Sequence, residues 1–323
     1  MRTIVKASAA PVSLRARDLR HVPLVVALAV LFVLGTVMKP DTFPTTSNMV
    51  TILTLASEIG VVTVGMTFVI IGGGIDLSVG AIMALSSIWA TTVATQSYGW
   101  AGMAFAAIVV GLACGLVNGL LIAYGGLVPF IVTLASMVAA RGLAEQISDR
   151  HSQIVTDATF LKLAYNRVLG VPLLVYLFLA VVVAGWLVLN RTTFGRRTFA
   201  VGGNREAARL AGIDVRRHTL LLYVISGLCC GIAAIMLTSQ ANTGSSTHGT
   251  LYELDAIAAV VIGGTLLTGG SGSIAGSILG VLVFTTIQDL FILANLQQPI
   301  QEIAKGAIIA VVLLIQRWNR RTT

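Results

Sequence analysis

Long runs of apolar residues recur along the whole chain, and most approach the length that crosses a lipid bilayer as one helix. About 20 apolar residues span the hydrocarbon core of a typical bilayer. Only 11% of the 323 residues are charged, less than half the share usual in soluble domains. We therefore expect an all-α integral membrane protein with about ten transmembrane helices. The runs are 22–38, 49–71, 78–96, 100–123, 127–144, 171–189, 219–240, 254–268, 273–294 and 299–316.

Basic residues are divided unequally between the segments that connect these runs. With a cytoplasmic N-terminus, the inner segments carry fifteen basic residues and the outer segments carry five. Lysine and arginine in short loops favour the cytoplasmic side, so we expect an N-in, C-in topology. The expected parts are a basic N-terminal tail at 1–21, a transmembrane domain at 22–316 with a cytoplasmic loop at 190–218, and a cytoplasmic tail at 317–323.

The positive charge has a membrane explanation. A net charge of +8 can indicate nucleic-acid binding, but here the basic residues lie between apolar runs, so no nucleic-acid partner is expected. The first run follows five basic residues and has no small-residue cleavage site after it. We interpret it as a retained signal anchor and first span.

Two glycine-rich segments, one in each half of the chain, interrupt apolar runs at corresponding positions. Non-helical backbone at membrane depth is tolerated only where protein or a wet cavity satisfies its polar groups, so paired interruptions favour a transport pathway. Two ordinary glycine-rich loops at the cytoplasmic face are the alternative. The residues concerned are Gly72, Gly73, Gly74 and Asp76 in the first half, and Asp255, Gly263, Gly264, Gly269 and Gly270 in the second.

Other glycines recur every four residues, which places them on one side of a helix. Small residues allow close approach of helices in lipid, so we interpret these positions as helix-packing surfaces rather than solute contacts. They are Gly111, Gly115 and Gly119 in one run and Gly272, Gly276 and Gly280 in another.

Few charges lie within or beside the runs, and each needs a partner or a function. Glu302 and Lys305 are three residues apart on one expected helix and are predicted to neutralise each other. Asp76 is expected to cap the following helix, with contact to a solute or a partner as the alternative. Asp255 begins an expected helix, where the helix dipole favours a negative charge.

The loop 190–218 contains a segment bounded by a helix-start and a helix-stop signal. Asn204 can cap a short helix and Gly212 can end it, with Arg205, Glu206 and Arg209 between them. We expect this helix to dock into a groove of another protein; a solvated basic loop is the alternative. The docking surface is expected to be an apolar knob of Ala207, Ala208, Leu210 and Ala211.

The chain lacks the sequence pattern of a nucleotide-hydrolysing loop. No G-x-x-x-x-G-K-[ST] occurs in the 323 residues, so ATP-driven work would need an ATPase on another subunit. We expect no catalytic residues, no metal site and no cofactor in this chain.

Two long motifs resemble the signature of permease subunits of bacterial monosaccharide ABC importers. The motifs are VGMTFVIIGGGIDLSVG at 64–80 and LDAIAAVVIGGTLLTGG at 254–270, and the similarity extends from about residue 45 to 318. The segment from Glu206 to Gly212 also matches the EAA-x-x-x-G pattern of ABC permease loops. Within the ribose, xylose, arabinose and galactofuranose class, the chain most resembles the galactofuranose-type permeases.

The resemblance implies a multi-pass permease in the bacterial inner membrane, surrounded by lipid. Its implied partners are a second permease subunit, identical or different, a cytoplasmic ATP-binding subunit that holds ATP and Mg, and a periplasmic sugar-binding protein. The implied cargo is a pentose or a galactofuranose-like sugar. A nucleoside or a furanose signal molecule is the nearest alternative cargo, and a secondary sugar transporter or a membrane enzyme acting on lipid-linked sugars are the alternative classes.

Overall fold

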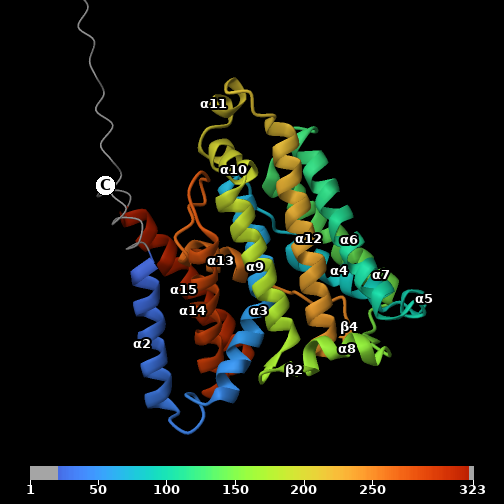
Figure 1. The fold of residues 1–323 in the computed structure, drawn as a ribbon, viewed down its shortest axis with the longest axis vertical. Coiled ribbons are helices and arrows are strands. Elements are labelled where there is room, and N and C mark those ends of the chain that lie inside the picture. The colour runs from blue at the N-terminus through green and yellow to red at the C-terminus, as the bar shows by residue number, and fades with distance from the viewer. Residues whose placement is uncertain (1–20, 320–323) are drawn as a thin grey trace, which may run out of the picture.

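The computed structural model describes residues 21–319, which form a bundle of helices with two very short antiparallel strand pairs (Figure 1). β1 (Gln153–Ile154) pairs with β4 (Thr243–Gly244), and β2 (Arg167–Val168) pairs with β3 (Val171–Pro172). The helices are α2 (Val22–Met38), α3 (Thr46–Ile71), α4 (Val79–Thr91), α5 (Val93–Gln96), α6 (Gly99–Ala123), α7 (Pro129–Ser148), α8 (Ala158–Tyr165), α9 (Leu173–Arg191), α10 (Thr193–Gly203), α11 (Arg205–Leu210), α12 (Val215–Ala241), α13 (Tyr252–Ile262), α14 (Ile274–Leu293) and α15 (Gln298–Asn319).

Every apolar run of the sequence contains a helix. Within residues 21–319, six helices are long and apolar enough to cross a membrane, namely α3, α6, α7, α9, α12 and α14. α2 and α4 are shorter apolar helices. The fold is thus that of a helical integral membrane protein.

The two predicted tails fall mostly outside the described part of the chain. Residues 1–20 and 320–323 are not described, so the expectations for the N-terminal tail at 1–21 and the C-terminal tail at 317–323 concern residues that lie almost wholly beyond it. The last helix, α15, continues through Asn319, past the expected end of the final run at 316.

Helix α3 forms the centre of the bundle and packs against α9, α12, α13 and α14. Its C-terminal half is apolar on all sides, which is typical of a helix buried on all sides. Every residue from Ala56 to Ile71 is buried. Side chains of α12 such as Tyr223 and Cys230 complete the same core. This core holds the end of α3, and therefore the first glycine segment, in a fixed position.

The expected glycine surface on α6 faces α12. A Cβ atom added to Gly111 would lie 2.3 Å from the carbonyl oxygen of Gly227, and one added to Gly115 would lie 2.4 Å from that of Tyr223. At Gly119 the nearest atom would be a backbone oxygen of α12 at 2.8 Å. The backbones of α6 and α12 therefore touch without intervening side chains, as close packing in lipid requires.

The second set of glycines lies where α13 meets α14. A Cβ at Gly276 would lie 2.2 Å from the carbonyl oxygen of Gly263, and one at Gly280 would lie 2.1 Å from that of Ala259. Gly272 precedes α14 and instead lies against the side chain of Thr265. The first turns of α14 are thus in backbone contact with the end of α13.

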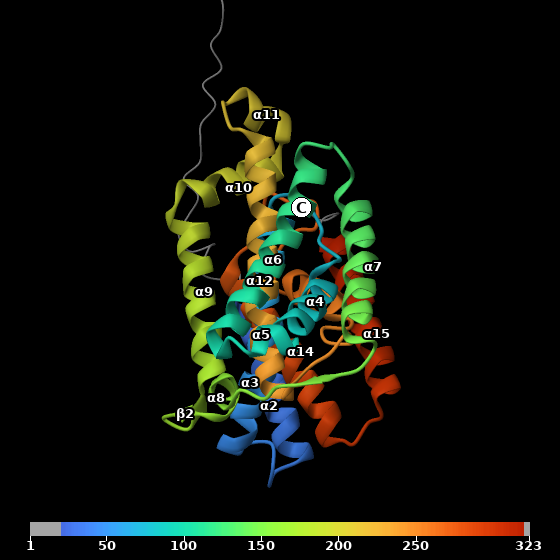
Figure 2. The same ribbon diagram turned by 90° about the vertical axis from the view of Figure 1, so that its right-hand side faces the viewer.

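The ends of the bundle differ. Figures 1 and 2 show α11 at one extremity, with the end of α15 in the same half of the molecule. In Figure 1, α2 begins near mid-height and runs away from α11. The turn that follows α2 and the short helix α8 lie toward the opposite extremity. The segment 190–218 therefore projects from the half that also contains the end of α15.

Candidate functional site

Helix α11 projects from the bundle and has the start and stop signals that the sequence indicates. The Oδ1 atom of Asn204 accepts a hydrogen bond from the backbone N–H of Ala207 at 2.9 Å. Gly212 has φ of +80°, a left-handed conformation that suits glycine after a helix. Arg209 donates to Glu206 at 2.6 Å, and this interaction lowers the pKa of the Glu206 carboxyl. The short helix is thus held at both ends and along one side.

The apolar knob on α11 is smaller than expected. Ala207 and Ala211 are exposed, and the side chain of Leu210 projects with 79% exposure. Ala208 is only 4% exposed, so its place on the outer knob was wrong. It faces inward because α11 rests on α10 and the start of α12, and the backbone N–H of Ile213 donates to the Ala208 carbonyl at 3.1 Å.

Helix α10, which was not expected, places two further glycines beneath α11. A Cβ added to Gly202 would lie 1.7 Å from the carbonyl oxygen of Ile71 and 2.7 Å from the backbone nitrogen of Gly270. That nitrogen itself donates to the Ile71 carbonyl at 2.8 Å. A Cβ on Gly269 would lie 2.8 Å from the Cα of Gly73. We call this meeting of residues 71–73, 202–203 and 269–270 the glycine junction.

The glycine junction brings together the two interrupted segments that the sequence singles out. Gly73, Gly269 and Gly270 all have positive φ, between +71° and +85°, a region that residues with a Cβ rarely adopt. Gly264, the other expected glycine with positive φ, has nothing within 4 Å of its Cβ position and does not take part. The projecting segment therefore contacts both interruptions through backbone atoms.

The remaining glycines of the first and second segments make local contacts. Gly72 lies against the side chain of Leu222, and Gly74 lies against the hydroxyl group of Tyr223. Gly263 contacts the backbone of α14 at Gly276. These three positions thus fit the interrupted helices against their neighbours rather than against each other.

Asp76 follows the first interruption and accepts hydrogen bonds inside the bundle. Its Oδ1 atom accepts from the N–H of Ser78 at 3.0 Å and from the Ser78 hydroxyl at 2.5 Å, and its Oδ2 atom accepts from Ser226 of α12 at 2.8 Å. Asn118 of α6 donates to Ser78 at 2.9 Å and accepts from Ser136 of α7. Asp76 is fully buried, so in this conformation it holds the start of α4 and does not face solvent.

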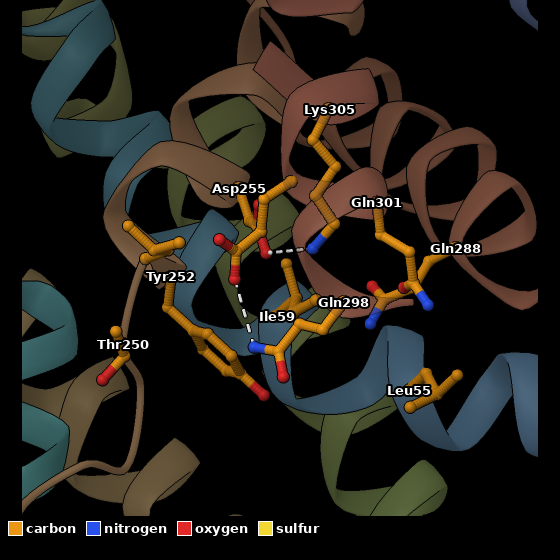
Figure 3. Close-up of a pocket in the computed structure, with 11 residues that line it drawn as sticks. Leu55, Ile59, Thr250, Tyr252, Asp255, Gln288, Gln298, Gln301 and Lys305 are labelled. Atoms are coloured by element: carbon orange, nitrogen blue, oxygen red, sulfur yellow. Dashed lines mark hydrogen bonds and ion pairs between the residues drawn. The ribbon is translucent and has the colours of Figure 1, made fainter. Parts of the chain in front are cut away.

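Asp255 lies in the first turn of α13 and forms an ion pair with α15. The Nζ atom of Lys305 lies 3.3 Å from Asp255 Oδ2, and the two side chains are 18% and 8% exposed (Figure 3). The expected pair of Lys305 with Glu302 was wrong, because Lys305 reaches across to the neighbouring helix. Glu302 accepts instead from the amide of Gln298 at 3.1 Å.

A cavity of about 330 Å³ lies between α3, α13, α14 and α15. We call it the polar cavity, and Figure 3 shows its lining. Most of its side chains are amides, hydroxyls or charged groups, while α3 contributes an apolar wall. The sequence analysis did not predict this site, although glutamines are unusual within apolar runs and could have indicated it. Its lining includes Ile59, Tyr252, Asp255, Gln288, Gln301 and Lys305.

The connection between α12 and α13 is packed against neighbouring helices. Arg141 of α7 donates to the carbonyl oxygens of Ser246 and His248. A Cβ at Gly80 would lie 2.1 Å from the carbonyl oxygen of Gly249. The segment is therefore held against α4 and α7. Across the described residues, no three His, Cys, Asp or Glu side chains are grouped so as to hold a metal ion.

Comparison with known proteins gives concordant matches over nearly the whole chain. Residues 48–315 match the family described as "Branched-chain amino acid transport system / permease component". The ribose import permease protein RbsC of Bacillus subtilis is 37% identical over 296 residues, 90% of each chain. The L-arabinose transport system permease protein AraH of Escherichia coli K12 is 37% identical over 300 residues, 92% of this chain and 90% of the relative. No solved structure matches the chain.

Fold and similarity together define a multi-pass permease subunit of the bacterial inner membrane, which is not an enzyme. The chain belongs to the branched-chain amino acid transport system / permease component family. The predicted resemblance to permeases of monosaccharide ABC importers is confirmed by the ribose and arabinose relatives, and ATP hydrolysis belongs to a separate subunit. The particular likeness to galactofuranose-type permeases stays a prediction.

Proposed function

We propose that this chain forms the translocation path of an ATP-driven importer for a neutral monosaccharide, a pentose or a galactofuranose-like sugar. The relatives named for ribose and L-arabinose import support this class of cargo. The observation that carries the mechanism is the glycine junction, where the end of α10, directly before the projecting helix α11, touches both interrupted segments.

The proposed topology has ten membrane crossings with both termini in the cytoplasm. The basic loop at 190–218 then lies on the cytoplasmic side, in agreement with the distribution of basic residues. The half of the bundle that carries α11 and the end of α15 is the cytoplasmic half in this arrangement. The turn after α2 and helix α8 face the periplasm.

The proposed assembly contains a second permease subunit, a cytoplasmic ATP-binding subunit and a periplasmic sugar-binding protein. ATP and Mg belong to the ATP-binding subunit, and this chain needs no cofactor. The exposed side chain of Leu210 and its neighbours Ala207 and Ala211 supply the apolar surface that docks in a groove of the ATPase. The coupling segment as a whole is Asn204–Gly212.

The proposed cycle uses the glycine junction as the link between the ATPase and the membrane helices. Closure of the ATPase dimer moves α11, and α10 moves with it because the two helices pack together. Gly202 then displaces the ends of α3 and of the segment after α13, with which it is in backbone contact. Such a displacement shifts the bundle between outward-open and inward-open states.

A neutral cargo agrees with the charges inside the bundle. The carboxylate of Asp255 is paired with Lys305, and that of Asp76 accepts three hydrogen bonds. These groups have protein partners and do not form a binding site for an ionised solute. A secondary transporter, the alternative mechanism, requires an ion or proton site that drives uptake.

Uptake by the reconstituted complex tests the proposal. Proteoliposomes that contain the permease, its ATPase and its binding protein should accumulate labelled D-ribose, L-arabinose or galactofuranose only with ATP, and an ionophore should leave uptake unchanged. Gly212→Leu and Ala208→Pro, which distort α11, should abolish coupled uptake while the chain still inserts. Uptake without ATP that collapses with an ionophore would show a secondary transporter, and selective uptake of a nucleoside would replace the sugar as cargo.

A further inference from the structure

The polar cavity lies between transmembrane helices, and its lining is rich in hydrogen-bonding groups. Gln288 comes from α14, and Gln298 and Gln301 come from the first turns of α15. Such amides are costly to place in an apolar environment unless they have partners. Their convergence on one cavity from separate helices, seen in Figure 3, indicates a place for a polar occupant.

One of these amides has an unused acceptor. The Oε1 atom of Gln288 is buried and has no hydrogen-bond partner within the described part of the chain. An unpaired buried acceptor is unfavourable, so a ligand hydroxyl that donates a hydrogen bond to it stabilises the complex. Gln301 already donates to the Leu296 carbonyl at 2.8 Å, which fixes the orientation of its amide.

The chemistry of the cavity selects a neutral, hydroxyl-rich ligand. Carboxamides offer both donors and acceptors, which matches hydroxyl groups that are also both. The one lysine is paired with Asp255, and Glu302 adds a further negative charge, so an anionic ligand is repelled. Leu55 and Ile59 of α3 form an apolar wall suited to the C–H face of a sugar ring.

The size of the cavity agrees with a monosaccharide. Its volume of about 330 Å³ lies at the lower end of the range for small-molecule sites, roughly 300–1,000 Å³. A disaccharide or a nucleoside needs more room than a single pentose or hexose. The cavity therefore fits the smallest members of the expected cargo classes.

The cavity is also connected to the glycine junction through one short helix. α13 carries Asp255 at its cavity end and stops at Gly263, a few residues before Gly269 and Gly270 of the junction. α15 contacts α13 through the ion pair of Lys305 with Asp255. A displacement of α13 from the junction would thus change the shape of the cavity.

We propose that the polar cavity binds a monosaccharide during its passage, with Gln288 and Gln301 as the residues that contact its hydroxyl groups. This inference rests on the proposed function, because it assigns a contact site to that sugar.

The kinetic test replaces the two amides in the complete complex of permease, ATPase and binding protein, with D-ribose and L-arabinose as probes. Gln288→Leu and Gln301→Leu should each raise the half-saturating sugar concentration for uptake by roughly two- to tenfold, the loss expected for one neutral hydrogen bond. Gln297→Leu is the matched control, since Gln297 is exposed next to α15 and does not line the cavity.

A labelling experiment separates sugar contact from a structural role. Gln301→Cys should react with a small maleimide, and saturating D-ribose should slow this reaction at least threefold; Gln297→Cys should react equally with and without sugar. The unmodified chain, with Cys114, Cys229 and Cys230, sets the background. If the unmodified complex imports a sugar but both leucine variants keep its half-saturation and the sugar gives no protection, the cavity assignment is overturned. If the unmodified complex imports neither probe nor any other monosaccharide, the proposed function fails instead.

Discussion

Replacing Gly202 with alanine is expected to disconnect α11 from both interrupted segments. The new Cβ would lie 1.7 Å from the Ile71 carbonyl oxygen, whereas such contacts are almost never shorter than 3.0 Å. The backbone must therefore separate by about 1.3 Å or more at this point. Because the contact atoms are backbone atoms, no side-chain rotation relieves the clash.

The free-energy cost follows from two contributions. Overpacking of a close contact costs about 1–3 kcal/mol. The hydrogen bond from the Gly270 N–H to the Ile71 carbonyl, 2.8 Å long, lies in the displaced region, and its loss adds about 1 kcal/mol. A total of about 2–4 kcal/mol lowers the population of the intact glycine junction roughly 30- to 700-fold relative to the separated one.

The neighbouring residue supplies the control. Gly203 belongs to the same helix, and its Cβ position has nothing within 4 Å, so Gly203→Ala should transport normally. Both variants are reconstituted with the ATPase and the binding protein, and sugar imported per ATP hydrolysed is measured. We expect at least a tenfold fall for Gly202→Ala, with insertion and ATPase binding retained. Equal coupling ratios for the two variants would refute the role of the glycine junction.

Three further outcomes are expected. Gly111→Ala should lower the free energy of unfolding in mixed micelles by about 1–3 kcal/mol, because the new Cβ would lie 2.3 Å from a carbonyl oxygen of α12. The control Gly142→Ala on α7 has nothing within 4 Å of its Cβ position and should not lower it. Equal effects of the two variants would exclude the contact between α6 and α12 as the cause. Asp76→Ala should lower the free energy of unfolding by about 2–4 kcal/mol in the same assay, since it leaves buried hydroxyl and N–H donors unpaired. Asp76→Asn keeps one acceptor oxygen and should lower it less. The reverse order would contradict the hydrogen bonds to Asp76. The pKa of Glu206, measured by NMR titration, should lie below the ordinary value of glutamate because Arg209 hydrogen-bonds to the carboxylate. The pair should therefore stabilise α11 fully above the ordinary pKa and lose this effect as the pH falls through the lowered pKa. An unchanged titration midpoint in Arg209→Gln would show that the pair does not form in the membrane-embedded protein.

The positions of the helices followed closely from the apolar runs, because hydrophobic length is a local property of the sequence. Each run contains a helix, and the run 254–268 contains only α13, which has 11 residues. Helices α8 and α10 were not anticipated. Both begin with polar caps, Asp157 and Thr192, whose side chains accept from backbone N–H groups three residues later, but neither forms an apolar run of membrane length.

The candidate site was only partly predictable, because its contacts join residues far apart in the sequence. The ends of α11 depend on neighbouring residues, and Asn204 and Gly212 were identified correctly as its start and stop signals. The partner of Lys305 is fifty positions away in Asp255, and no helical spacing indicates it. The meeting of Gly202 with both interruptions likewise depends on how three segments fold together.

The location of Gly202 has a consequence for the order in which the two halves of the chain move. A flexible side chain between moving parts can change rotamer and absorb part of a displacement before the next part responds. Here carbonyl and amide groups meet directly, and the same residue adjoins Ile71 in the first half and Gly270 in the second. In the proposed cycle, a displacement of Gly202 therefore reaches both halves of the chain together, and neither half moves ahead of the other.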